Sequence, residues 1–348
     1  MGIECNRASP AARPADYEQA AALRTQICAR AISRVHPPLA MRNALPMSRS
    51  PAFLVLYLAT APFASSLAQQ NDANEEGGSN SFGEVLGRQI RLDYSFEPES
   101  DLDAGGTIRL QEAAFSTPLF GRKIGEDWLV AMRLRYRLSE LDWQNQALLD
   151  DDPLHRLDLN LSLIYRPESS PWTAFLSAGP ALASDDSGPS NDAWLFTAIA
   201  GAGYRFSDRF TLLAGAYYSQ DFGESRLLPG PGFIWTPTEK WSLSLIPPRL
   251  RIAYAPAADW RVALEAFPNG GRWSVRTTDG QKAFLDRGGA RAGLRIERRV
   301  IGENGWLHVG AGWVFSRDLT LEAGDGAVLF DSRADSGVFV STGFSWRF

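Results

Sequence analysis

Side chains alternate along the last twelve residues of the 348-residue chain, and this alternation limits the folds open to the chain. Mostly large residues hold one parity, and mostly small or polar residues hold the other. The first set comprises Val338, Val340, Thr342, Phe344, Trp346 and Phe348. A period of two is the side-chain period of a β-strand, because successive Cβ atoms leave opposite faces. We therefore expect a β-strand here, with an aromatic residue at its end.

The same alternation recurs upstream, where arginines mark one face of each strand. In the stretch from Trp128, apolar residues hold one parity and Arg133, Arg135 and Arg137 hold the other. An arginine that faces lipid near the bilayer midplane costs about 2–4 kcal/mol, so a membrane barrel would turn this face inward. The expected inner, solute-facing residues are Arg133, Arg135, Arg137, Arg156, Arg287, Arg291, Arg295 and Arg299.

Short polar turns with aromatic residues on their shoulders separate many of these strands. Rings of amphipathic aromatic side chains are typical of the lipid–water boundary of membrane barrels. The expected girdle residues are Trp128, Trp172, Phe210, Trp241 and Trp260. The loops that connect the opposite ends of the strands are longer and more polar, as in outer-membrane barrels. The pattern predicts an all-β fold, a transmembrane antiparallel up-and-down β-barrel over residues 87–348.

The number of strands depends on two short segments that flank Pro247-Pro248. Counting them as wall strands gives 14, which we favour, and treating them as a tucked hairpin gives 12. Near the C-terminus we expect single strands at 285–300 and 305–320, followed by a long loop over 321–336. Residues 69–80 are polar and Gly-rich and predict a flexible linker, which we assign to 69–86.

The N-terminal region predicts export. Arg49, an apolar run over 52–64 and the small-residue ending Ser66-Leu67-Ala68 are typical of a secretory signal peptide, assigned to 47–68. Residues 1–46 do not fit an export signal. We interpret them as a mis-called or disordered extension, with translation beginning at Met41 or Met47.

Charge and cysteine content exclude several classes of function. Both cysteines precede residue 69, so disulfides and cysteine-ligated metals are not expected in the exported part. Residues 1–68 carry seven arginines and three acids, which leaves the remainder of the chain at about −9. That acidity argues against a nucleic-acid partner, since phosphate neutralisation needs a basic face. No metal or cofactor motif is present.

The C-terminal strand resembles the terminal strand of bacterial outer-membrane β-barrels, through Ser341, Gly343, Trp346 and Phe348. In those proteins this pattern is an assembly signal. The stretch 228–267 resembles a porin-like family of outer-membrane barrels of unknown function from Gram-negative bacteria. The resemblance implies a location in the cell outer membrane. It also implies outer-membrane lipid, lipopolysaccharide and the barrel-assembly machinery as partners, with no established catalytic residues.

The residues leave three functions open. An arginine-rich lumen favours a channel or uptake pore for small solutes, because rings of arginine bias a pore towards anions. The same arginines could instead pair with acids and pack a closed structural barrel. A barrel lipid hydrolase would need a Ser–His–acid set. We expect no enzyme, because the exported part holds only His155 and His308, and no serine there has a recognisable nucleophile context.

Overall fold

The computed structural model describes residues 89–348 except 145–147, 150–151, 189–190 and 223. The expected extension, signal peptide and linker lie outside the described residues. None of the helices in the described part is long and apolar enough to cross a bilayer.

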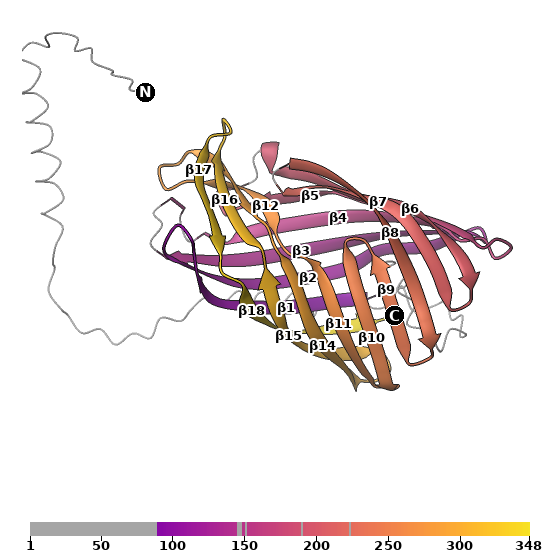
Figure 1. The fold of residues 1–348 in the computed structure, drawn as a ribbon. Helices are drawn as coiled ribbons and strands as arrows, with labels where there is room; N and C mark the ends of the chain where they lie inside the picture. The colour runs from indigo at the N-terminus through magenta and orange to yellow at the C-terminus, as the bar shows by residue number, and fades with distance from the viewer. Residues whose placement is uncertain (1–88, 145–147, 150–151, 189–190, 223) are drawn as a thin grey trace, which may run out of the picture. The chain divides into compact units, whose positions relative to one another are not determined.

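Fourteen antiparallel strands pair in a closed ring, in which β18 pairs with β1 and completes the wall (Figure 1). The predicted fold class and the favoured count of 14 are confirmed. The wall strands are β1 (Gln89–Asp101), β2 (Thr107–Ile124), β3 (Trp128–Gln144), β4 (Leu154–Tyr165), β5 (Trp172–Ser184), β6 (Trp194–Ser207), β7 (Phe210–Phe222), β8 (Glu224–Thr238), β9 (Trp241–Ile246), β10 (Arg249–Ala257), β11 (Trp260–Pro268), β14 (Ala290–Ile301), β15 (Gly305–Phe315) and β18 (Gly337–Arg347). A short 3-10 helix, η1 (Asn191–Ala193), precedes β6.

Four further strands lie outside this ring and form what we call the cap. They are β12 (Gly271–Arg276), β13 (Lys282–Arg287), β16 (Arg317–Ala323) and β17 (Val328–Ala334), in the pairing order β12-β13-β16-β17. The single strands expected at 285–300 and 305–320 are therefore wrong, and so is the loop expected over 321–336. Ser316 has a φ of 50°, a left-handed conformation that strands do not use, and it separates β15 from β16.

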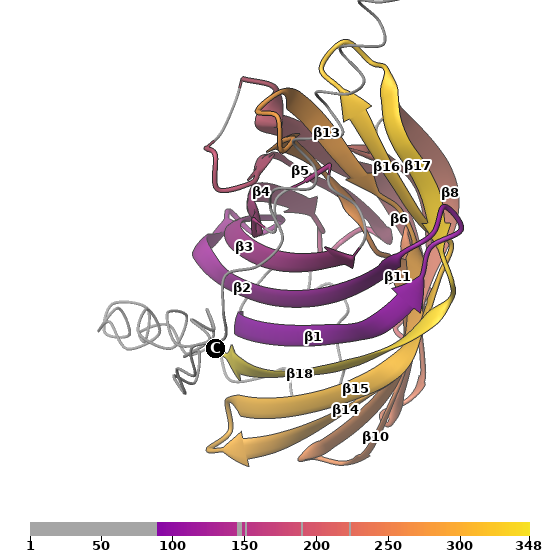
Figure 2. The same cartoon turned by 90° about the vertical axis from the view of Figure 1, so that its left-hand side faces the viewer.

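The cap is joined to the wall at both of its edges. At one edge Ser274 of β12 pairs with Ser184 of β5, and at the other Ala334 of β17 pairs with Leu102, which directly follows β1. Figure 2 shows β13, β16 and β17 on the side of the barrel interior opposite β14 and β15.

An apolar core holds the cap against the long-loop end of the wall. The cap contributes Trp273 and Leu321, both essentially inaccessible to solvent, while the wall contributes Trp143 and Leu195. Its buried members are Leu102, Ile108, Trp143, Leu154, Ala181, Ala183, Leu195, Trp273, Val275, Ala283, Leu285, Leu319, Leu321 and Ala334. Burying this set stabilises the cap against the wall, since apolar burial contributes about 25 cal/mol per Å².

The outer face of the wall is apolar over its whole middle. On β4, Leu157, Leu159 and Leu161 are exposed, the last at 51%, whereas Arg156 and Ser162 of the other parity are buried. The same exposure pattern continues around the ring at Leu176, Phe196, Leu212, Leu264, Leu294, Val309, Trp313, Val338 and Val340. The structure thus places the arginine-bearing parity inside the barrel.

The wall is lowest at the β9–β10 hairpin. β9 has six residues, fewer than the 9–11 that a transmembrane strand needs. Above it, residues 224–231 of β8 pair with β7 alone among the described strands. Pro229 and Pro231 lie two residues apart in this segment. Proline has no backbone N–H, so neither residue leaves an unsatisfied donor at this unpaired edge. The short wall therefore accommodates two prolines that a central strand would not.

Candidate functional site

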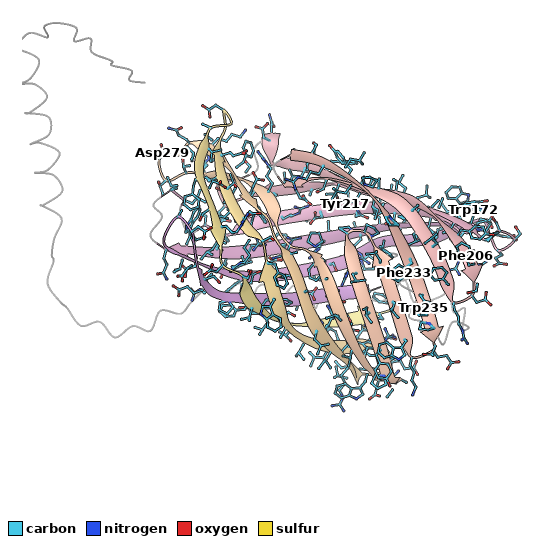
Figure 3. All side chains as sticks on the ribbon, viewed as in Figure 1. Trp172, Phe206, Tyr217, Phe233, Trp235 and Asp279 are labelled. Atoms are coloured by element: carbon cyan, nitrogen blue, oxygen red, sulfur yellow. The ribbon has the colours of Figure 1, made fainter. Side chains whose placement is uncertain are left out.

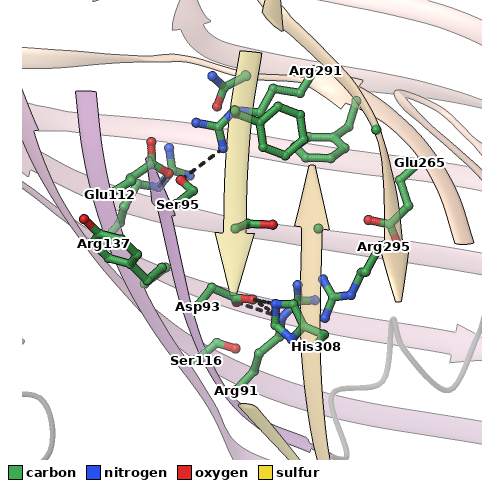
Figure 4. Close-up of a pocket in the computed structure, with 18 of the residues that line it drawn as sticks. Arg91, Asp93, Ser95, Glu112, Ser116, Arg137, Glu265, Arg291, Arg295 and His308 are labelled. Carbon is green, nitrogen blue, oxygen red and sulfur yellow. Dashed lines mark hydrogen bonds and ion pairs between the residues drawn. The ribbon is translucent and has the colours of Figure 1, made fainter. Parts of the chain in front are cut away.

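A cavity of about 320 Å³ lies inside the barrel, below the cap. Seven arginines and three carboxylates line it, all from the inward parity of the wall strands. They are Arg91, Arg133, Arg135, Arg137, Arg249, Arg291 and Arg295, with Asp93, Glu112 and Glu265. Figure 4 labels some of these side chains around the cavity, namely Arg91, Asp93, Glu112, Arg137, Glu265, Arg291 and Arg295. The cavity is therefore lined by a net excess of positive charge.

Glu97 of β1 anchors the upper edge of this site. Its carboxylate is 2.5 Å from Arg291 of β14 and 3.0 Å from Arg317 of the cap, and it also accepts a hydrogen bond from Asn269. Glu97 is 2% exposed, and both arginines are buried. This buried group therefore ties the wall to the cap by charge as well as by apolar packing.

Most other inner arginines also have a carboxylate partner. Glu112 lies 3.1 Å from Arg287 and 3.7 Å from Arg137. Further pairs join Arg91 to Asp93 at 2.7 Å, Arg249 to Glu265 at 3.0 Å, Arg295 to Glu297 at 2.8 Å and Arg347 to Glu297 at 2.6 Å. These charge-assisted pairs, some within one strand and others between strands, fix the positions of the inner guanidinium groups.

Arg135 differs from these residues. It lines the cavity and is exposed there, opposite Asp158 and Ser116 in the two strand registers. Within the described part of the chain no carboxylate oxygen lies within 4 Å of its guanidinium. Arg135 thus presents an exposed guanidinium to the cavity.

The eight arginines predicted for the lumen fall into two groups. Arg133, Arg135, Arg137, Arg291 and Arg295 line the cavity. The other three lie elsewhere. Arg156 pairs with Asp158 and Asp221 at 2.8 Å each, and Arg299 lies over the Trp306 ring at 6.0 Å.

Arg287 does not belong to the barrel wall at all. It sits on β13 of the cap and reaches down to Glu112. The single strand expected at 285–300 assigned it to the wall, and the break between β13 and β14 corrects that assignment.

Three residues that line the cavity, and Glu97 above it, were not anticipated. Arg91, Arg249, Glu97 and Glu112 were missed, although Arg91 and Glu97 share the parity of Asp93 on β1. Applying the same inward parity along the whole of β1 would have predicted Arg91 and Glu97 as inner residues. Arg249 gave no such signal, because it directly follows the Pro247-Pro248 turn.

The two histidines occupy different environments. His308 is buried in the interior and its Nε2 is 3.2 Å from Asp93. His155 lies near the rim, where it contacts the Tyr136 hydroxyl at 2.6 Å and the Asp186 carboxylate. Among the described residues no cluster of three or more His, Cys, Asp and Glu side chains could hold a metal ion.

The five expected girdle residues each begin a wall strand, and all five strands begin at the short-turn end. Trp128, Trp172 and Trp241 are exposed and pack against tyrosines of neighbouring strands, with ring centroids 4.7–5.0 Å apart. Phe210 and Trp260 are half-buried. Figure 3 shows Trp172 at the end of the barrel opposite Asp279, which lies in the cap.

The proposed assembly-signal residues belong to β18 and the residue after it. Ser341 lines the cavity, Gly343 faces the interior, and Trp346 pairs with Ile90 of β1. Phe348 is exposed at the end of the chain.

The family model described as "Domain of unknown function (DUF6268)" matches residues 123–347. No curated protein matches this chain in sequence.

Among solved structures, the chain is similar to the COG4313 outer membrane channel from Pseudomonas putida F1, at 10% identity and a TM-score of 0.44, covering 80% of this chain and 100% of that one. The KdgM porin matches at 10% identity and a TM-score of 0.31, over 74% and 99% of the two chains. A Pseudomonas aeruginosa FadL homologue matches at 12% identity and a TM-score of 0.35, covering 75% of this chain and 90% of that one. Similarity at this level says nothing about solute, and the fourteen-strand closure follows from the strand pairing itself.

Proposed function

We propose that this chain, which belongs to the DUF6268 family of unknown function, is an outer-membrane β-barrel of a Gram-negative cell that takes up small anionic solutes. The observation that carries the proposal is the lining of the inner cavity, where seven arginines face three carboxylates. An excess of fixed positive charge between low-dielectric walls concentrates anions and excludes cations.

The outer face supports the membrane location. A wall that exposes Leu161, Leu294 and Trp313 to water would be unfavourable, since each apolar side chain contributes about 1.5–3 kcal/mol when it leaves water. Lipid can cover such a face all round a closed barrel, and a soluble partner cannot easily do so. Outer-membrane lipid and lipopolysaccharide are therefore the proposed partners of this surface, with the barrel-assembly machinery as the partner of β18.

The cap limits how the pore conducts. Its apolar core fills the long-loop end of the barrel, and apolar constrictions oppose the passage of hydrated ions. We expect small or infrequent conductance steps in the wild-type protein. The cap core also supports the second candidate, a closed structural barrel.

Single-channel recordings in planar bilayers under a salt gradient test the proposal. We expect a reversal potential that indicates anion preference, and a smaller preference in Arg135→Gln. Arg333→Gln is the matched control, because Arg333 lies on the outer side of the cap in an exposed pair with Asp318.

A cap variant separates the two candidates. Leu285→Ala opens a cavity in the cap core and should increase the frequency of openings. Cation preference would contradict the arginine argument. No conductance in either the wild type or Leu285→Ala would favour the closed structural barrel.

A further inference from the structure

A second chamber of about 270 Å³ lies inside the barrel beside the cationic cavity, and its lining is mainly apolar. The inward-facing apolar side chains come from five wall strands and one turn: Ile164, Phe175, Ile199, Leu213, Ile246 and Pro247. Its polar lining comprises three serines, Ser162, Ser177 and Ser244, and the buried Arg251, which pairs with Glu265 at 3.5 Å and Glu297 at 3.7 Å. Apolar residues on the inner face of a barrel are unusual, because that face is normally polar.

Glycines in the facing wall let this chamber form. A Cβ on Gly201 would lie 2.7 Å from the Phe175 ring, so the ring rests directly on the backbone of β6. A Cβ on Gly232 would lie 3.1 Å from Pro247, which allows the β9–β10 turn to fold over β8. The chamber is therefore built by the packing of these residues and is not a gap left by loose strands.

The chamber and the cationic cavity meet at two arginines. Arg133 and Arg249 line both spaces. Arg249 pairs with Glu265 through one terminal nitrogen at 3.0 Å, while its buried Nε has no hydrogen-bond partner among the described residues. A guanidinium at the mouth of an apolar chamber offers N–H donors to an anionic group whose apolar part lies within.

We propose that this junction binds an amphipathic organic anion, with its carboxylate at Arg133 and Arg249 and its apolar group in the chamber. The inference deepens the proposed uptake function and rests on it. An apolar cavity of about 150 Å³ is enough to hold benzene, so the chamber fits a substituted aromatic ring or a short acyl chain. Inorganic anions would leave the chamber empty.

The position of the chamber suits such a ligand. Ile246 and Pro247 form its wall at the top of the six-residue strand β9, where the barrel wall is too short to cross the hydrocarbon layer. A molecule that partitions into the bilayer is thus close to the chamber, whereas a purely hydrophilic anion is not.

The test uses ¹⁹F NMR titration of the full folded barrel in detergent, with barrel-free micelles as the blank. The probes are 3-(4-fluorophenyl)propanoate and its neutral amide, and acetate is used as a competitor without an apolar group. We expect the propanoate to bind at least about tenfold more tightly than the amide, because a hydrogen bond to a charged group is worth that much or more. Acetate should compete at least about tenfold more weakly than the propanoate itself.

Three variants assign the two halves of the site. Arg249→Gln should remove most of the preference for the carboxylate over the amide. Ile246→Trp fills the chamber and should weaken both aromatic probes at least about tenfold. Leu245→Trp is the matched control, since Leu245 precedes Ile246 on β9 and has the outward parity. Heat-modifiable migration on gels confirms that each variant is folded.

Equal affinity for the propanoate and the amide would overturn the inference, as would equal effects of Ile246→Trp and Leu245→Trp or no binding of the aromatic probes. Anion preference in planar bilayers would survive these results and leave the uptake function intact. Loss of anion preference with the binding pattern preserved would overturn the uptake function alone.

Discussion

The imidazole of His308 lies against the backbone of Gly343, and a Cβ at position 343 would be 2.4 Å from His308 Cε1. The same Cβ would be 2.2 Å from the carbonyl oxygen of Leu92 on β1. Gly343 therefore lets β18 close the barrel between β15 and β1 while a large side chain occupies the interior.

The first prediction concerns this contact. Gly343→Ala should reduce the yield of folded barrel on refolding from urea into detergent, because the backbone of β1 must shift to admit the methyl group. Ser341→Ala on the same strand should refold like the wild type. Refolding in detergent involves no assembly machinery, so it tests only the packing of Gly343 against β1. A defect seen only in cells would contradict this packing explanation and support a role of Gly343 in the assembly signal.

The second prediction concerns the buried carboxylate between wall and cap. Glu97→Gln leaves Arg291 and Arg317 without their counter-charge and should lower the free energy of unfolding by roughly 3 kcal/mol. Urea unfolding monitored by tryptophan fluorescence measures the change.

The matched control is Asp142→Asn, which breaks an ion pair with Arg109 whose side chains are 45% and 41% exposed. We expect a loss below about 1 kcal/mol there. Similar losses in the free energy of unfolding for Glu97→Gln and Asp142→Asn would show that burial does not set the contribution of these ion pairs to stability.

The third prediction concerns the pH dependence of the cap. Burial raises the pKa of Asp286 on β13 to about 6, with Arg272 opposing the rise and Glu322 adding to it. Between the ordinary value of 3.8 and about 6, the folded cap binds more protons than the unfolded chain, so its stability falls as pH rises.

Hydrogen exchange of cap amides, corrected for intrinsic rates, should show an opening free energy higher at pH 5 than at pH 7 by about 1 kcal/mol. Asp286→Asn should lose this difference, while Asp325→Asn at the β16–β17 turn should keep it. A pH dependence that persists in Asp286→Asn would assign the effect to another group.

The fourth prediction tests the facing of the strands. Leu161→Arg puts a guanidinium on the exposed outer face of β4 and should cost about 2–4 kcal/mol in lipid vesicles. Asn160→Arg places the same group on the neighbouring inner position and should cost clearly less. Equal costs would mean that lipid does not cover the face that carries Leu161.

Alternation alone was sufficient to predict the wall, because a strand with lipid on one side and charged groups on the other must separate its residues by parity. Arg133 and Arg135 were placed inside on that basis, and both line the cavity. Partners on other strands could not be predicted in this way. Glu97 and Arg291 are 194 residues apart in sequence, and nothing local to either residue indicates the other.

The cap shows a different limit. Arg287 shares the parity of Arg291 and Arg295, and Leu319 shares that of Trp313 and Phe315, so 285–300 and 305–320 were each interpreted as one strand. At the breaks after Arg287 and at Ser316 the chain leaves one neighbouring strand and pairs with another. The side-chain period of two continues through both breaks, so alternation alone cannot detect them.

By itself, the sequence determined the class of fold and the face of each wall strand, and it favoured 14 strands over 12, since these depend on a local period of two and on turn residues. Only the tertiary structure decided which arginines share the cavity, how the cap closes one end, and where Arg133 and Arg249 meet an apolar chamber. These features depend on contacts between distant strands, and ring closure and side-chain packing select those contacts.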